Sequence, residues 1–206
     1  MLPTYFLTPT PTLTPTPPPT HPSILSNLTL FGPYMDHETH VRKFGVDIVA
    51  VIDKSGSMDD GKLRLVKETL HFMISELKAQ DRLCLVTFST KVFTDMKLTH
   101  MTEEGKALAE DVVGAIVADG TTNLSGGLYE GLRNLHEDKE NVNDISTVML
   151  FTDGAANEGE TGTTRIVRSM VSNLVRVKSA CSVFTFGYGY GTDADMLSKI
   201  SDAGGF

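Results

Sequence analysis

The sequence contains few cysteines and no long apolar segment, and both scarcities narrow the class of protein. Of its 206 residues only Cys84 and Cys181 are cysteines. Each falls in an apolar run that predicts a β-strand, and the topology expected below keeps these strands apart. A disulfide needs Cα atoms within about 7 Å, so we expect two free thiols, which favour a reducing, cytoplasmic compartment. No run approaches the roughly 18 apolar residues of a membrane span, so we expect no membrane insertion.

Positive charge is also scarce. The chain carries 26 acidic and 18 basic residues, a formal net charge of −8. Such a field does not attract nucleic acid, so we expect no nucleic-acid partner. An acidic partner must then be captured by a local positive centre.

Proline and charge are divided unevenly along the chain. All nine prolines lie at or before Pro33, and no Asp, Glu, Lys or Arg precedes Asp36. The stretch 8–22 (TPTPTLTPTPPPTHP) is too poor in apolar residues to build a core and favours extended polyproline structure. We therefore predict a disordered leader or linker over residues 1–40, most simply a plain spacer rather than a glycosylated stalk or docking motif. A single domain is expected from residue 44 to residue 206.

Within the domain, apolar strand-like runs alternate with amphipathic helical stretches. Periodicity predicts strands at 46–52, 83–88, 92–96, 147–152 and 182–186, the third of these at an edge, and helices at 63–77, 108–116, 124–135, 166–174 and 193–201. Strands that alternate with helices form right-handed crossovers and a mostly parallel sheet. We expect an α/β fold, doubly wound, with helices on both faces of the sheet.

A cluster of oxygen-bearing side chains follows the first buried strand. Asp53, Ser55 and Ser57 stand in an Asp-x-Ser-x-Ser pattern on a strand-to-helix turn. Taken alone the pattern is of moderate weight, because the serines could simply cap a helix that starts near Gly61.

Two later loops add to this signal. The run Gly120-Thr121-Thr122-Asn123 opens a helix, and Asp153 follows the strand at 147–152. Thr122 or Asn123 could be a helix N-cap, and Asp153 could belong to an ordinary turn. In a doubly wound sheet, however, ligands bind outside the carboxyl ends of the strands at the point where the winding reverses. The joint arrangement therefore predicts a metal site there, with Asp119, Glu158 and Glu160 left as rim residues of unassigned role.

The same segments resemble the von Willebrand factor A (vWA) family over about residues 44–206. The resemblance rests on VDIVAVIDKSGSM, DRLCLVTFST, DGTTNLSGGL and VMLFTDG, which are most similar to inter-α-trypsin-inhibitor-like members and to plant vWA proteins that carry RING fingers. It implies a metal-ion-dependent adhesion site with Asp53, Ser55, Ser57, Thr122 and Asp153 as ligands of Mg²⁺, or of Mn²⁺ or Ca²⁺. The family pattern also continues into a further edge strand, so we expect the sheet to lack its last edge strand.

The ligand set predicts how such a site binds. Mg²⁺ takes six oxygen ligands, so three hydroxyls and two carboxylates leave a position open. The resemblance implies that an Asp or Glu carboxylate of a partner protein fills it. We therefore expect a metal-dependent protein-binding module.

Two alternatives remain beside the binding module. One is the substrate-recognition part of a larger enzyme such as a ubiquitin ligase, although this sequence contains no RING-type Cys/His array. The other, a metallohydrolase, is disfavoured because the first strand is followed by no Asp-x-Asp pair, phosphate-binding loop or Gly-x-Gly-x-x-Gly turn, and no histidine obviously converges on the serines. We expect no catalysis by this domain.

Overall fold

Strands and helices alternate along the chain, as the periodicity predicts. A computed structural model describes residues 45–138, 143–154 and 156–205, so the predicted leader at 1–40 lies outside the described residues. The elements in order are β1 (Asp47–Asp53), a 3-10 turn η1 (Gly56–Met58), α1 (Lys62–Glu76), β2 (Arg82–Phe88), β3 (Val92–His100), α2 (Glu103–Ala115), α3 (Leu124–Glu137), β4 (Ile145–Thr152), α4 (Thr163–Leu174), β5 (Ala180–Gly187) and α5 (Ala194–Gly204).

The strands form one sheet in the order β3-β2-β1-β4-β5. Pairs β1–β2, β1–β4 and β4–β5 are parallel, and only β3 runs antiparallel at an edge. The predicted α/β, mostly parallel architecture is confirmed. β3 extends beyond the predicted 92–96 to His100, which pairs with Arg82. The extension was missed because its half-buried polar residues belong to an edge strand, where burial imposes a weaker pattern.

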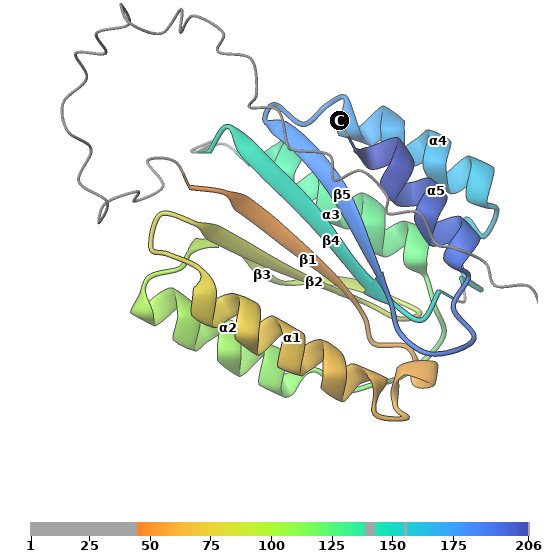
Figure 1. Ribbon diagram of the computed structural model, residues 1–206, viewed down its shortest axis with the longest axis horizontal. Helices are drawn as coiled ribbons and strands as arrows, with labels where there is room; N and C mark the ends of the chain where they lie inside the picture. Colours follow the sequence, from red (N-terminus) through yellow and green to blue (C-terminus); the bar gives the residue numbers. More distant parts are fainter. Residues whose placement is uncertain (1–44, 139–142, 155, 206) are drawn as a thin grey trace, which may run out of the picture. The chain divides into compact units, whose positions relative to one another are not determined.

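Two hydrophobic layers cover the two faces of the sheet. α1 and α2 lie on one face, and α3, α4 and α5 lie on the other (Figure 1). Alternate residues of β1 serve both layers, since Val49 and Val51 pack with α3 while Ile48 and Ile52 pack with α1. All seven residues of β1 are buried, which explains its continuous apolar run.

Helix α3 approaches the centre of the sheet closely. A Cβ atom placed on Gly131 would lie 2.6 Å from Cγ2 of Val51, so only glycine fits there without a shift. This contact fixes the height of α3 above β1, and with it the loop that precedes α3.

A buried ion cluster closes the opposite end of β1 from the predicted site. The Arg82 guanidinium donates to both carboxylate oxygens of Asp47, at 2.8 and 2.6 Å, and to Asp138 at 2.9 Å. Asn143 donates to Asp47 at 2.7 Å. The hydrogen bonds from Arg82 to Asp47 and, to a smaller extent, to Asp138 hold the pKa of Arg82 above its ordinary value. Such a fully paired cluster pins β1, β2 and the end of α3 together.

The cysteines behave as predicted. Cys84 on β2 and Cys181 on β5 are both buried and free, and two strands separate them in the sheet. Burial raises the pKa of the Cys84 thiol to about 12, so it is a packing residue rather than a reactive one. Among the described residues, no helix is long and apolar enough to cross a bilayer.

The winding of the sheet reverses beside β1. The chain proceeds from β1 outward through β2 and β3, and then returns to the other side of β1 with β4 and β5. Because β1 and β4 are parallel neighbours with Ile52 opposite Phe151, their carboxyl ends open at the same edge. This is the location at which doubly wound sheets bind ligands.

Candidate metal centre

Asp53 ends β1 and is fixed from two sides. One carboxylate oxygen accepts a hydrogen bond from the backbone nitrogen of Ser55 at 2.8 Å, and the other accepts from the hydroxyl of Thr152 at 2.6 Å. The residue is fully buried, and burial is the main reason that the pKa of Asp53 lies above its ordinary value of 3.8. The hydrogen bonds lower this pKa and the charge of Asp153 raises it further. An ionised carboxylate held in this way gains stability from a nearby cation.

Ser55 and Ser57 lie on the turn after β1, with their hydroxyl oxygens 3.1 Å apart. The capping alternative is wrong for both: α1 begins at Lys62 behind Gly61, and no side chain caps it. Ser55 precedes η1 without a side-chain capping bond. Neither hydroxyl is therefore needed to satisfy a helix end.

The loop that carries Thr122 is joined to this turn by backbone hydrogen bonds. Gly56 N donates to Gly120 O at 3.0 Å, and Asp119 N donates to Lys54 O at 2.7 Å. Thr122 itself is buried, and its backbone nitrogen donates to the Asn157 side chain at 2.8 Å.

The N-cap alternative holds for the neighbouring residue and not for Thr122. Asn123 caps α3, because its side-chain oxygen accepts from Gly126 N at 3.0 Å. The Thr122 hydroxyl has no part in that cap.

Asp153 follows β4, and its two carboxylate oxygens have different surroundings. Oδ2 accepts from the Lys62 ammonium at 2.9 Å. Oδ1 is buried and has no hydrogen-bond partner among the described residues. An unsatisfied buried polar atom costs about 1–3 kcal/mol, and more if it is charged. A cation bound there would satisfy it, so the residues fit a metal ion.

The structure thus brings the five predicted ligands to one edge of the sheet. Asp53 connects to Ser55 and, through Thr152, to the strand that ends before Asp153, and the charge of Asp153 adds to the effect of burial on the pKa of Asp53. Across the described parts of the chain, three or more His, Cys, Asp or Glu side chains never gather as a metal site. The proposed set consists of two carboxylates and three hydroxyls, a composition suited to a hard cation. Their role as metal ligands stays a prediction.

Three residues at this edge were not singled out from the sequence. The Thr152 hydroxyl donates to Asp53 and accepts from Gly154 N at 3.0 Å. It therefore links the end of β1, at Asp53, to the end of β4, which precedes Asp153. Asn157 orients Thr122, and Lys62 contacts Asp153. Position next to Asp153 was the only sequence signal for Thr152, and Lys62 and Asn157 gave none because their contacts span distant loops.

The rim residues have individual roles. Asp119 pairs with Lys54 at 3.1 Å, and hydrogen bonds from Ser89 and Lys54 lower its pKa. The backbone nitrogen of Glu158 donates to Thr122 O, and Glu160 accepts from Tyr129.

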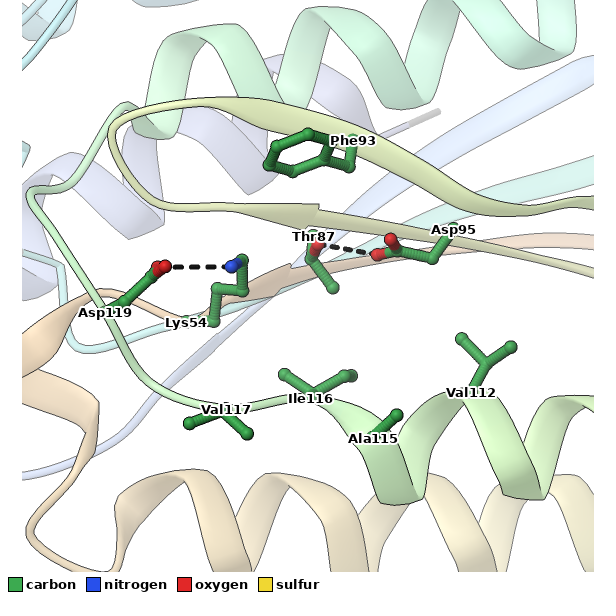
Figure 2. Close-up of a pocket in the computed structure, with 9 residues that line it drawn as sticks. All are labelled: Lys54, Thr87, Phe93, Asp95, Val112, Ala115, Ile116, Val117 and Asp119. Atoms are coloured by element: carbon green, nitrogen blue, oxygen red, sulfur yellow. Dashed lines mark hydrogen bonds and ion pairs between the residues drawn. The ribbon is translucent and has the colours of Figure 1, made fainter.

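A recess of about 500 Å³ opens next to the site on the α2 side of the sheet. Figure 2 shows Val112, Ala115, Ile116 and Val117 along one side of it, with Phe93 and the Lys54–Asp119 pair opposite. The Lys54 ammonium also lies 5.6 Å from the centre of the Phe93 ring. Lys54 lines the recess and stands between Asp53 and Ser55 in the chain, so one wall of the recess adjoins the turn that carries the proposed ligands.

Comparisons with known proteins agree with this geometry. The family model for the von Willebrand factor type A domain matches residues 47–206. Human inter-alpha-trypsin inhibitor heavy chain H1 is 31% identical over 160 residues, 75% of this chain and 17% of that protein. The E3 ubiquitin-protein ligase WAV3 of Arabidopsis thaliana is 34% identical over 130 residues, 63% of this chain and 17% of the ligase. The chain therefore spans less than a fifth of the length of either relative.

Solved structures show the same fold. A von Willebrand factor type A protein from Catenulispora acidiphila superposes with a TM-score of 0.65 at 22% identity, covering 78% of this chain and 37% of that one. Because the family model matches most of the chain and the sheet order fits, the chain belongs to the von Willebrand factor type A family, whose domains act as protein-interaction modules.

Proposed function

We propose that this domain binds partner proteins through a divalent cation, Mg²⁺ first of all, that captures an Asp or Glu side chain of the partner. The observation that carries the proposal is the buried Oδ1 of Asp153, which no group in the described part of the chain satisfies, beside the buried carboxylate of Asp53. The Lys62 ammonium offsets only one of these two buried negative charges, so a further cation at the unsatisfied oxygen would stabilise the domain.

The chemistry of the ligands argues for a guest carboxylate. Asp53, Ser55, Ser57, Thr122 and Asp153 would hold the ion, which supplies a positive centre able to bind a further oxygen. Hydroxyls are neutral, so the two carboxylates only balance the charge of a divalent ion. An open position on such an ion favours an anionic oxygen ligand. The centre lets a chain of net charge −8 bind an acidic side chain that its overall field would repel.

The recess in Figure 2 gives the partner a second contact. Val117 is 71% exposed and Phe93 is 47% exposed, so apolar surface is available next to the metal position. The carboxylate bound to the metal would orient the partner, and burial of apolar surface beside it would add to the binding affinity.

The experiment is a selection from a random peptide library displayed on phage, run in Mg²⁺ and in EDTA. Peptides that bind only in Mg²⁺ are expected to share an Asp or Glu, and replacing it by Asn or Gln should abolish binding. Thr122→Ala should lose these peptides, because it removes one proposed ligand. The matched control is Thr121→Ala, since Thr121 is exposed and its hydroxyl contacts Thr90. Binding that survives EDTA, or equal loss in both variants, contradicts the proposal.

A second candidate function rests on the plant relatives. WAV3 and WAVH1 of Arabidopsis thaliana are named E3 ubiquitin-protein ligases, and this chain matches 17% and 20% of their lengths. In that setting the domain would select the protein to be ubiquitinated. A WAV3 chimera that carries residues 45–205 in place of its own vWA domain tests this, with Asp153→Asn as the control. Ubiquitination of a protein fused to a peptide from the library selection is expected only with the unaltered domain.

We do not propose a catalytic role for Ser55 or Ser57. A hydrolytic serine needs a base, and the three described histidines have other surroundings. His71 pairs with Glu110, His100 contacts the carbonyl of Ala79, and His136 lies in the last turn of α3. None of these three described histidines has a contact with Ser55 or Ser57 among the hydrogen bonds of the described residues.

A further inference from the structure

Lys62 is placed where helix physics disfavours a lysine. It is the first residue of α1, and that turn contains no acidic residue. The amino end of a helix carries partial positive charge, so a lysine there destabilises the helix. Its position therefore calls for another interaction that offsets the cost.

That interaction is with the proposed metal centre. The ammonium donates to Asp153 Oδ2 at 2.9 Å and to the carbonyl oxygen of Ser57 at 2.9 Å. The side chain is only 27% exposed. The aliphatic part of the side chain packs against the loop after β5, where a Cβ atom placed on Gly189 would lie 2.9 Å from Lys62 Cε. Lys62 is thus held in place by the turn after β1, the end of β4 and the loop after β5.

We propose that Lys62 sets the charge of the loaded site: it weakens metal binding and in exchange strengthens the attraction of the bound metal for a carboxylate. The inference rests on the proposed function. It adds a residue that contacts the ligands and tunes their selectivity without itself coordinating the metal.

The net charge of the loaded site depends on Lys62. The two carboxylates neutralise a divalent cation, so without Lys62 the loaded site is neutral overall. With the Lys62 ammonium on the outer oxygen of Asp153, the loaded site carries one net positive charge. That charge repels the incoming cation and attracts the incoming carboxylate. Metal affinity and carboxylate affinity must therefore change in opposite directions when it is removed.

Lys54 provides a matched comparison on the same rim. Figure 2 shows its ammonium directed at Asp119, and the separation is 3.1 Å. Asp119 is not a proposed ligand and its side chain is 64% exposed. The Lys54 side chain itself is 16% exposed, so Lys54→Met removes the same formal charge at a similar burial, but from a pair whose carboxylate is open to solvent and outside the proposed ligand set.

The experiment uses Mn²⁺ and acetate as probes, with the domain as it exists. Free Mn²⁺ is counted by electron paramagnetic resonance to give the metal affinity. Acetate is then titrated while water-proton relaxation is recorded, since a carboxylate that replaces a metal-bound water reduces the relaxation enhancement. Lys62→Met, Lys62→Arg and Lys54→Met are compared with the wild type, after circular dichroism and thermal melts show that each is folded.

In Lys62→Met we expect Mn²⁺ to bind about tenfold more tightly and acetate to bind several-fold more weakly, the effect of one unit charge in a solvent-like dielectric. Lys62→Arg keeps the charge and should resemble the wild type. Lys54→Met should change either constant by no more than about twofold.

Weaker Mn²⁺ binding in Lys62→Met, no change, or a shift of both affinities in one direction overturns the inference. A wild-type domain that binds no Mn²⁺ overturns the proposed function as well. A wild type that binds Mn²⁺ while Lys62→Met matches it overturns only the role of Lys62. Should Lys62→Met fail to fold, Lys62→Gln at the same partly exposed position replaces it.

Discussion

Replacing Asp53 by asparagine should have opposite effects on the metal-free and the metal-loaded domain. Burial, foremost, raises the pKa of Asp53 in the folded state, and the charge of Asp153 adds to this. The ionised carboxylate is therefore destabilising in the metal-free domain at neutral pH. Asp53→Asn removes the charge and keeps the acceptor for the Ser55 backbone nitrogen, so metal-free stability should rise.

The direction of the Asp53 pKa shift determines the pH range in which this effect is seen. A folded-state pKa above the unfolded one contributes stability that is complete below the unfolded pKa, near 3.8, and is lost as the pH rises through the folded value. The advantage of Asp53→Asn over the wild type should thus be greatest at neutral pH. It should shrink as the pH falls toward 3.8.

The metal-loaded domain gives the magnitude. At a Mg²⁺ concentration of about 100 times the dissociation constant, binding stabilises the wild type by about 2.7 kcal/mol. For a folded domain spanning residues 47–206 this corresponds to a rise in melting temperature of about 5–10 °C. If Asp53→Asn, which loses a ligand charge, binds Mg²⁺ about 100-fold more weakly, the same Mg²⁺ concentration only matches its dissociation constant, and the rise should be about 1–2 °C.

The assay is differential scanning fluorimetry after EDTA treatment, with and without added Mg²⁺, from pH 4 to pH 8. Asp119→Asn is the control, because this exposed aspartate pairs with Lys54 outside the proposed ligand set. A lower metal-free melting temperature in Asp53→Asn refutes the electrostatic reasoning. An undiminished Mg²⁺ response refutes the assignment of Asp53 as a ligand.

Three further predictions concern packing and partner contact. Arg82→Met should destabilise the domain by about 3–5 kcal/mol in urea unfolding, because it leaves the buried Asp47 carboxylate without its cation, and a loss below about 1 kcal/mol would contradict that account. Gly131→Ala should cost about 1–3 kcal/mol in the same assay, since its methyl group would meet Val51, and an unchanged midpoint would show that α3 moves freely. Val117→Asp should weaken peptide binding by about tenfold while leaving Mg²⁺ affinity unchanged by calorimetry, because it introduces charge into apolar surface of the recess; equal peptide binding would place the partner elsewhere.

The sheet was predictable because burial determines its sequence. β1 and β4 are covered on both faces or nearly so, and their continuous apolar runs give both their existence and their order. β3 was predicted too short because its later residues are half-buried or exposed at an edge. Periodicity detects burial, so its accuracy falls where burial ends.

The five proposed ligands were predictable because three loops end at one edge of a parallel sheet. The sequence left the capping alternative open at each loop, because the choice between capping and ligation depends on the exact start of each helix. Gly61 precedes α1, and Asn123 caps α3 in place of Thr122. Boundaries of this kind are the least certain part of a sequence-based prediction.

The supporting contacts were beyond sequence reasoning. Lys62 looks like a solvated lysine at the start of a helix, and its contact with Asp153 spans 91 residues. Thr152 looks like the last residue of an ordinary strand, and its bond to Asp53 spans 99 residues. Contacts of this range follow from the assembled fold, because residues so far apart in the chain leave no local pattern.

Anomalous diffraction from crystals grown with Mn²⁺ tests the central claim most directly, because it locates the ion without reference to binding curves. We expect one strong peak among the side-chain oxygens of the five proposed ligands, in contact with the hydroxyls of Ser55, Ser57 and Thr122 and facing the carboxylates of Asp53 and Asp153. A peak bound by other residues, or none at a Mn²⁺ concentration that saturates the protein in solution, would contradict it.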